Sequence, residues 1–157
     1  MKFTVRKALD SDSDAILQCL SLAFAPYRSA YTPDAYLDTV LTAHTIQQRL
    51  AEMSVFVAIV PSGEVVGTIG CQALEGGEGH LRGMAVRPEW QGQAVSTALL
   101  EAAEEELRRA GCVRVTLDTT EPLRRAVRFY EKHGFSCTGR IACFFGMPLH
   151  EYSKTLK

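Results

Sequence analysis

The segment HLRGMAVRPEWQGQAVSTALLEAAEEEL, residues 80–107, contains the clearest structural pattern in the chain. It begins with a short apolar run over residues 81–86, which is typical of a buried strand. Pro88 ends this strand, because proline cannot donate a hydrogen bond to a neighbouring strand. After a polar loop, apolar residues recur every three or four positions from residue 95 to residue 110, and Glu104 falls on the opposite, polar face. The segment therefore predicts a strand, a tight loop and an amphipathic helix.

A loop of this kind suits a bound anion. The first backbone N–H groups of a helix have no partner within the helix, and the positive end of the helix dipole lies beside them. Phosphate groups bind well at such a helix start. A nucleotide phosphate would fit the loop alone, although the GxxxxGK[ST] pattern of nucleotide-binding loops is absent. The loop and the first helical turn consist of Gln91, Gly92, Gln93, Ala94, Val95, Ser96 and Thr97.

The run from Val86 to Leu100 resembles the acetyl-CoA-binding motif of the GNAT acyl-CoA N-acyltransferase superfamily. The family pattern is Gln or Arg, two residues, Gly, one residue, and then Gly or Ala. Gln91 fits the first place, and the last two places hold Ala94 and Ser96. Ala94 departs from the pattern, because its methyl group narrows the space where a pyrophosphate would meet the backbone.

Two further segments resemble the same family. Residues 126–135, AVRFYEKHGF, match its A-x-x-F/L-Y-x-x-x-G-F signature. Residues 145–149, FGMPL, followed by Lys154, resemble its closing strands. The three matches follow the family's order and cover roughly the C-terminal half of the chain, so the sequence is identified as a member of this superfamily.

The elements expected from the residues agree with the fold that the resemblance implies. Apolar periodicity and turn signals predict strands near residues 3–6, 54–60, 65–73, 81–86, 113–117, 135–144 and 147–154, and helices near residues 16–24, 33–41, 45–50, 95–110 and 123–133. We expect one α/β (α+β) domain over residues 1–157, with a mixed, centrally splayed sheet of about seven strands flanked by helices. Residues 26–33 are expected to be irregular. By the resemblance, the strand ending at Val86 and the strand beginning near Cys112 part, and the pantetheine arm of CoA enters the gap.

The resemblance also implies which residues bind the donor, acetyl-CoA. Main-chain groups of Met84 and Val86, with Ala85 between them, would hold the pantetheine arm. The loop over residues 91–96, together with Thr97, would hold the pyrophosphate. Tyr130 matches the tyrosine that gives a proton to the departing CoA thiolate in many family members. A purely packed aromatic is the alternative for Tyr130, because it lies on the apolar face of its helix.

The general base has several candidates. His80 aligns with the position near the start of the central strand where many family members carry a glutamate. A histidine has a reference pKa near 6.5 and accepts a proton at neutral pH, but a strand-edge histidine facing water is the simpler interpretation. Glu78 and Glu75 in the preceding segment are alternatives, and so is a chain of water molecules with no side-chain base.

Acceptor specificity is expected to come from the first half of the chain and from the loop between the last two strands. The first region, residues 26–32, contains Tyr27, Arg28 and Tyr31, and the second spans residues 144–147. Arg28 would bind a carboxylate on the acceptor if it faced the site. A solvent-exposed arginine is the alternative.

We therefore expect an acetyl-CoA-dependent N-acetyltransferase that moves the acetyl group directly to a primary amine of a small molecule or peptide. A CoA-binding regulatory domain with little or no catalysis is the alternative, because Ala94, Ser96 and the open choice of base depart from a clear catalytic pattern. The formal net charge of −1 gives no electrostatic case for nucleic acid or membrane as a partner. The closing strands suggest a possible homodimer, by the resemblance.

Cysteine usage and the absence of other signals complete the expectations. The cysteines are scattered and never paired as CxxC, and most sit in apolar contexts, which predicts reduced core thiols in a cytoplasmic protein. The N-terminal segment lacks the apolar core of a signal peptide. No zinc-ligand spacing occurs, so no metal is expected. The five cysteines are Cys19, Cys71, Cys112, Cys137 and Cys143.

Overall fold

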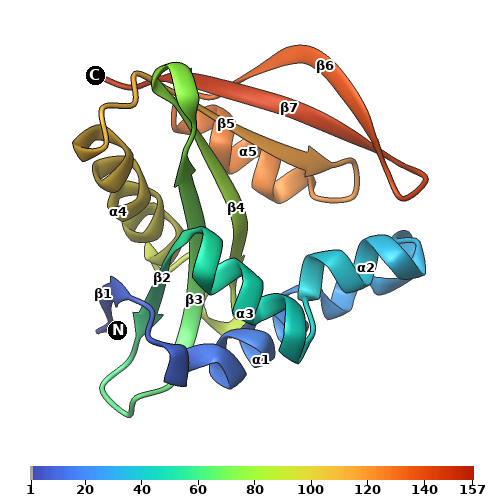
Figure 1. Cartoon of the computed structure of the whole chain (residues 1–157). Coiled ribbons are helices and arrows are strands. Elements are labelled where there is room, and N and C mark those ends of the chain that lie inside the picture. Colours follow the sequence, from blue (N-terminus) through green and yellow to red (C-terminus); the bar gives the residue numbers. More distant parts are fainter. Residues whose placement is uncertain (1) are drawn as a thin grey trace.

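Seven runs of apolar and β-branched residues pair into one mixed sheet in the computed structural model, which describes residues 2–157 (Figure 1). The strand order is β1-β2-β3-β4-β5-β7-β6. All neighbouring pairs are antiparallel except β4 and β5, which are parallel. The strands are β1 (Thr4–Lys7), β2 (Ser54–Ile59), β3 (Val65–Ala73), β4 (Glu78–Val86), β5 (Arg114–Thr120), β6 (Ser136–Phe144) and β7 (Met147–Thr155). The predicted fold class is therefore confirmed.

Helices cover both faces of this sheet. Figure 1 shows α1 and α3 on one side of β2–β4 and α4 on the other. Within residues 2–157, none of the helices combines the length and the apolar character needed to cross a bilayer. The helices are α1 (Ser13–Phe24), α2 (Pro33–Val40), α3 (Ala43–Glu52), α4 (Val95–Arg109) and α5 (Arg124–Lys132).

The period-2 alternation of β2 separates two apolar cores. Val55 and Val57 belong to the cluster formed with α1, whereas Phe56 and Ala58 belong to the cluster formed with α4. Leu99 of α4 is fully buried against β3, at 0% exposure. A buried leucine contributes about 1.5–3 kcal/mol, so the apolar stripe read from the sequence is what fixes α4, and the loop before it, on the sheet.

The central strands part as expected. β4 pairs with β5 only over residues 78–81, which face residues 114–117. Beyond this point β4 has a bulge relative to β3. Thr68 pairs with Ala85 and Gly70 pairs with Arg82, so β4 has one residue more than β3 between these two pairs. Such a bulge bends a strand, and Gly83 within it adopts a φ of 70°. β4 therefore turns away from β5, and the gap between them lies in the middle of the sheet.

Two local expectations were wrong, and a third, that of core thiols, holds for three of the five cysteines. β4 begins at Glu78 rather than at residue 81, because the loop before it is tied back by a hydrogen bond from the Leu74 N–H to the Glu78 carbonyl. Residues 25–30 form a 3₁₀ helix, since Pro26 sits in its first turn, where a missing N–H costs nothing. Cys137 and Cys143 are exposed, because β6 is an edge strand, whereas the other three cysteines are buried.

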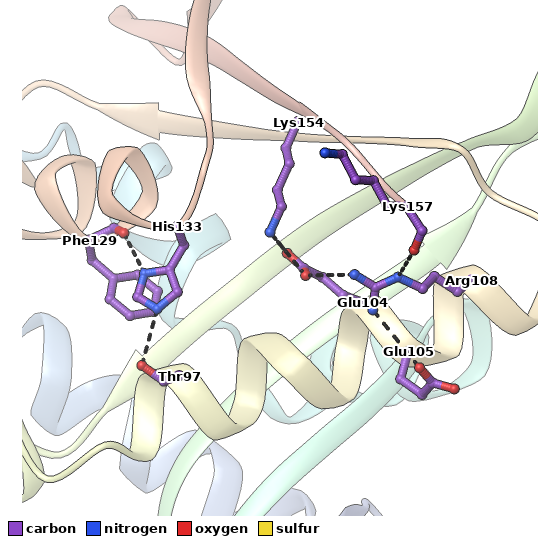
Figure 2. A network of polar contacts seen from close by, with 8 residues as sticks. All are labelled: Thr97, Glu104, Glu105, Arg108, Phe129, His133, Lys154 and Lys157. Carbon is purple, nitrogen blue, oxygen red and sulfur yellow. Dashed lines mark hydrogen bonds and ion pairs between the residues drawn. The ribbon is translucent and has the colours of Figure 1, made fainter.

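Glu104 does not lie on a solvated face either. It is only 5% exposed, and its carboxylate accepts two hydrogen bonds from Lys154 of β7, at 2.8 and 3.1 Å (Figure 2). Arg108 lies 3.5 Å from the same carboxylate and donates to the main-chain carbonyl of Lys157. These contacts tie the last strand to the helix whose first turn forms the predicted phosphate site.

Candidate active site

Two cavities open on either side of the gap between β4 and β5. One, of about 380 Å³, is bounded by the start of α4, by α5 and by the end of β4. The other, of about 360 Å³, lies towards α2, α3 and the start of β4. They meet at the gap, because the same five residues line both: Phe24, Met84, Leu123, Ala126 and Tyr130. We call the first the α4 cavity and the second the α3 cavity.

Most of the residues predicted to bind the donor line the α4 cavity. Gln93 is exposed and does not line it, and the side chain of Val95 is buried in the core, so that only its main chain is available. The predicted residues that line it are Met84, Ala85, Val86, Gln91, Gly92, Ala94, Ser96 and Thr97.

The start of α4 has the backbone of an anion site. Gly92 and Ala94 both adopt left-handed conformations, with φ of 79° and 66°, which turn the loop sharply into the helix. Among residues 2–157, no side chain caps the helix start. The first-turn N–H groups of an α-helix have no acceptor within the helix, so at α4 they are available to a ligand. Gln91 does not point its amide at them, since its Nε2 donates to the Val86 carbonyl at 3.2 Å.

His133 is a residue of this cavity that the sequence did not assign to the donor site. Its Nδ1 lies 2.9 Å from the Phe129 carbonyl and therefore carries the proton, because a carbonyl only accepts (Figure 2). In the neutral imidazole, Nε2 then accepts from the Thr97 hydroxyl at 3.3 Å. Thr97 thus offers a ligand its backbone N–H rather than its hydroxyl proton. Arg125 and Lys132 also line the cavity and add positive charge.

Tyr130 stands where the two cavities meet. It is 7% exposed, and its ring packs edge-on against Phe129 and Phe135. Within residues 2–157 its hydroxyl makes no hydrogen bond, and burial raises its pKa, so the phenol stays protonated at neutral pH. The Tyr130 ring is therefore packed against its neighbours, while its hydroxyl remains free to donate a hydrogen bond at the gap.

The gap also contains an orphaned polar atom. Thr119 of β5 is 4% exposed, and its hydroxyl finds no partner among the residues described. A buried hydroxyl without a hydrogen bond is costly. Since Thr119 lines the α3 cavity beside Met84 and Tyr130, a polar ligand in the gap would satisfy it. A pantetheine arm, which carries two amides, fits this requirement.

His80 and Asp118 form a pair in the α3 cavity. The Thr116 hydroxyl lies 3.4 Å from the Gly79 carbonyl and can only donate to it, so it accepts from the Nδ1–H of His80 at 2.9 Å. The unprotonated Nε2 lies 3.8 Å from Oδ2 of Asp118. Burial lowers the pKa of His80 below 6.5, and burial raises the pKa of Asp118. His80 is therefore neutral at pH 7, with its free lone pair beside a carboxylate.

The other candidate bases lie outside both cavities. Glu78 pairs with Arg114 of β5, and neither it nor Glu75 lines a cavity. Glu75 sits at the far end of β4 from the gap, in a short 3₁₀ turn.

The residues expected to select the acceptor are only partly brought together. Tyr31 lines the α3 cavity and its hydroxyl is 2.7 Å from that of Thr120, whereas Tyr27 lines the α4 cavity. Arg28 is exposed, with its guanidinium 5.3 Å from the centre of the Tyr36 ring, and it lines neither cavity. Of residues 144–147, Phe144 lines the α3 cavity. The cavity residues that sequence reasoning missed include Asp38, Arg49, Arg82, Asp118 and Thr119.

Solved structures share this architecture. Ard1 from Thermoplasma volcanium superposes with a TM-score of 0.82 at 20% identity, over 100% of this chain and 99% of that one. The PaiA N-acetyltransferase from Thermoplasma acidophilum, solved in complex with coenzyme A, gives a TM-score of 0.79 at 16% identity, over 99% of both chains. The splayed sheet is thus the fold of acyl-CoA-dependent N-acyltransferases.

Sequence comparison specifies the family. The family model described as "Acetyltransferase (GNAT) family" matches residues 16–135. The aminoglycoside N(6')-acetyltransferase type 1 of Stenotrophomonas maltophilia is 33% identical over 154 residues, which are 93% of this chain and 94% of that protein. The chain therefore belongs to the GNAT acetyltransferase family. It is an N-acetyltransferase that uses acetyl-CoA as its donor.

Proposed function

We propose that the chain binds acetyl-CoA across the gap between β4 and β5 and transfers the acetyl group directly to a primary amine in the α3 cavity. The observation that carries this proposal is the meeting of the two cavities at Tyr130. A donor in one cavity and an acceptor in the other would place their reacting atoms side by side there. Holding two reactants in this way supplies much of the catalysis that an acyl transfer needs.

The donor would be held mainly by main-chain groups. The first-turn N–H groups of α4 and the positive charges of Arg125 and Lys132 suit the pyrophosphate and the phosphate of CoA. The edge of β4 at Met84 and Val86, which β5 leaves unpaired, suits the amides of the pantetheine arm, with the Thr119 hydroxyl opposite. At Val86 the N–H is the group available, because the carbonyl accepts from Gln91. Bound acetyl-CoA supplies a reactive thioester, and the chain's own groups move the protons.

The proton steps are assigned to three side chains. An amine that enters as an ammonium would donate to Asp118 and to Nε2 of His80, whose atoms lie 3.8 Å apart. His80 would accept the proton that the amine loses, since it is neutral at pH 7. Tyr130, kept protonated by burial, would donate to the sulfur that leaves.

Direct transfer is supported by the cysteines. Cys71 is fully buried, and burial raises its pKa to about 12, so it does not form a thiolate at neutral pH. Cys143 lies on the exposed strand β6 and lines neither cavity. Neither thiol is therefore proposed to carry the acetyl group.

The acceptor is proposed to be a small molecule or a peptide end. The S. maltophilia relative acts, by its name, on a nitrogen of an aminoglycoside, which supports a small-molecule amine. The expectation of a homodimer stays a prediction. It is supported by the exposed edge strand β6, on which Ile141 is 60% exposed.

Melting temperatures with acetyl-CoA, CoA and ATP at equal concentration test the donor site. A ligand at one hundred times its dissociation constant adds about 2.7 kcal/mol of stability, which is roughly 5–10 °C for a domain of this size. We expect this increase with both CoA species and none with ATP. An increase with ATP alone would replace the donor site by a nucleotide site.

Acetylation of an amine panel then tests the catalytic role of Tyr130. Tyr130→Phe should lower kcat roughly 10²-fold while keeping the CoA-induced increase in melting temperature, because the ring still packs. Tyr152→Phe is the matched control, since Tyr152 lies on β7 and lines neither cavity. Equal kcat values for the two variants would remove Tyr130 from the mechanism. CoA binding without acetylation of any amine would leave only a CoA-binding regulatory domain.

A further inference from the structure

Arg49 is a charged residue of the α3 cavity for which the mechanism above has no use. It lies in the last turn of α3, and its guanidinium rests on the bulge of β4. A Cβ built on Gly83 would lie 3.3 Å from the Cζ of Arg49. The guanidinium is therefore held against the part of β4 that turns away from β5, next to Met84 and the proposed thioester position.

Within the described part of the chain, this guanidinium has no partner. Among residues 2–157, its side chain makes no ion pair and no hydrogen bond. The nearby carboxylate of Asp38 is already paired with Arg82, at 2.7 Å. Burial, and then the charge of Arg82, lower the pKa of Arg49 to about 10, so it remains positively charged at pH 7. Partial burial of a cation without a partner carries a desolvation cost, and the five N–H donors of this guanidinium are available to an acceptor on a ligand.

The charges of the α3 cavity are divided between its ends. Asp38 and Arg82 neutralise each other. The positive charge of Arg49 then remains near the bulge, at one end of the cavity. At the other end lie Asp118, on β5, and His80, on the paired part of β4. A polycationic acceptor gains no net attraction from this arrangement. An acceptor with an amine at one end and an anion at the other would satisfy both ends.

We propose that Arg49 binds a carboxylate of the acceptor, so that the preferred substrates are small primary amines that carry a carboxylate, such as amino acids. This inference rests on the proposed use of the α3 cavity for the acceptor. The planar guanidinium forms two parallel hydrogen bonds to a carboxylate, which orients as well as attracts the substrate. With its carboxylate fixed at Arg49, the amine is directed to Asp118 and His80.

The test compares matched acceptors on the CoA-bound protein. A panel of L-amino acids is paired with the corresponding carboxamides, which keep the amine and side chain but lack the charge. Binding is measured as a change in melting temperature and by calorimetry with CoA present, and KM and kcat are measured with acetyl-CoA. We expect at least one amino acid to bind and react with a KM at least tenfold lower than that of its carboxamide.

Arg49→Met removes the charge and keeps an apolar stem over Gly83. It should raise the KM of the amino acid at least tenfold and leave the KM of the carboxamide within twofold. Arg49→Lys, which retains the charge without the paired donors, should give an intermediate KM. If Arg49→Met does not fold, Arg49→Lys is the variant that tests the proposal. Arg28→Met is the control, because Arg28 is exposed and lines neither cavity; it should change neither KM.

The outcomes distinguish a failure of the proposed substrate class from a failure of the proposed acetyl transfer. Acetylation of amino acids and carboxamides with equal KM in wild type and in Arg49→Met would overturn the role of Arg49 and leave the acetyltransferase intact. Binding of amino acids that is lost in Arg49→Met, without acetylation, would support the carboxylate site and contradict the proposed catalysis. A lower melting temperature in Arg49→Met with an unchanged KM ratio would show that Arg49 only packs on β4, and the inference would fall.

Discussion

Ala94 occupies the one left-handed position of the phosphate loop that the family pattern assigns to glycine. A left-handed conformation costs an L-residue roughly 1–2 kcal/mol, and part of this is recovered because alanine has less freedom than glycine in the unfolded chain. Ala94→Gly should therefore raise the free energy of unfolding by about 0.5–1 kcal/mol, or by roughly 1–4 °C in melting temperature.

The same substitution tests whether the methyl group obstructs the donor. Calorimetric titration with CoA should give an equal or lower dissociation constant for Ala94→Gly than for wild type, because removal of the methyl group can only open the approach to the helix start. A weaker complex would mean that the side chain at this position contacts the donor favourably, contrary to the narrowing inferred from the sequence.

His80 should set the acid limb of the pH profile. Burial lowers its pKa below the usual 6.5, and it acts as a base only when neutral. Activity should therefore persist at pH 6.5 and decline as the pH falls through this lowered value. The profile of kcat/KM against pH, measured with one acceptor, gives the midpoint directly.

A variant distinguishes His80 from a water chain. His80→Gln keeps a hydrogen bond to Thr116 but cannot take up a proton, and it should lower kcat/KM roughly 10²-fold and abolish the acid limb. An unchanged limb in His80→Gln would assign it to another group, with Asp118 the first to consider because its pKa is raised by burial.

At the scale of elements, the ion pair between Glu104 and Lys154 joins α4 to β7. Lys154→Met would leave the buried carboxylate with only the more distant Arg108, at 3.5 Å. Removing one partner of a buried pair costs about 3 kcal/mol, so the melting temperature should fall by roughly 6–12 °C.

A double variant isolates the charge from the packing. Glu104→Gln with Lys154→Met removes both charges, and it should be more stable than Lys154→Met alone, because no carboxylate is then left unpaired. If the double variant is the less stable of the two, the carboxylate of Glu104 is satisfied without Lys154.

The elements themselves were predictable where the signal is local. The apolar stripe of α4 and the alternation of β2 identify these elements from single segments. The environment of Glu104 was not predictable in this way. Helical periodicity places it on a polar face, but Lys154 reaches it from fifty positions further along the chain, and no local pattern contains that information.

At the scale of the whole molecule, the sequence alone does not predict which side chains meet around the gap between β4 and β5. The loop at Gln91–Thr97 and Tyr130 could be predicted as site residues because each belongs to a contiguous motif. Asp118 and Arg49 belong to none: they lie on β5 and α3, and only the folded chain places both in the α3 cavity, beside the bend of β4 at Gly83. Arg28 was the arginine suggested by its neighbourhood in sequence, yet the 3₁₀ helix directs it to solvent over Tyr36.

The parting of β4 and β5 also affects how well the folded chain resists proteolysis and aggregation. It creates a strand edge inside the sheet, with main-chain groups that exchange with solvent and invite pairing with other chains. With the pantetheine arm in its proposed place, the donor substitutes for the missing strand and binds only the folded state, so it stabilises the fold by mass action. Resistance to proteases and to aggregation should therefore rise with the surrounding concentration of CoA species, and the supply of donor would govern how much enzyme persists as well as how fast it works.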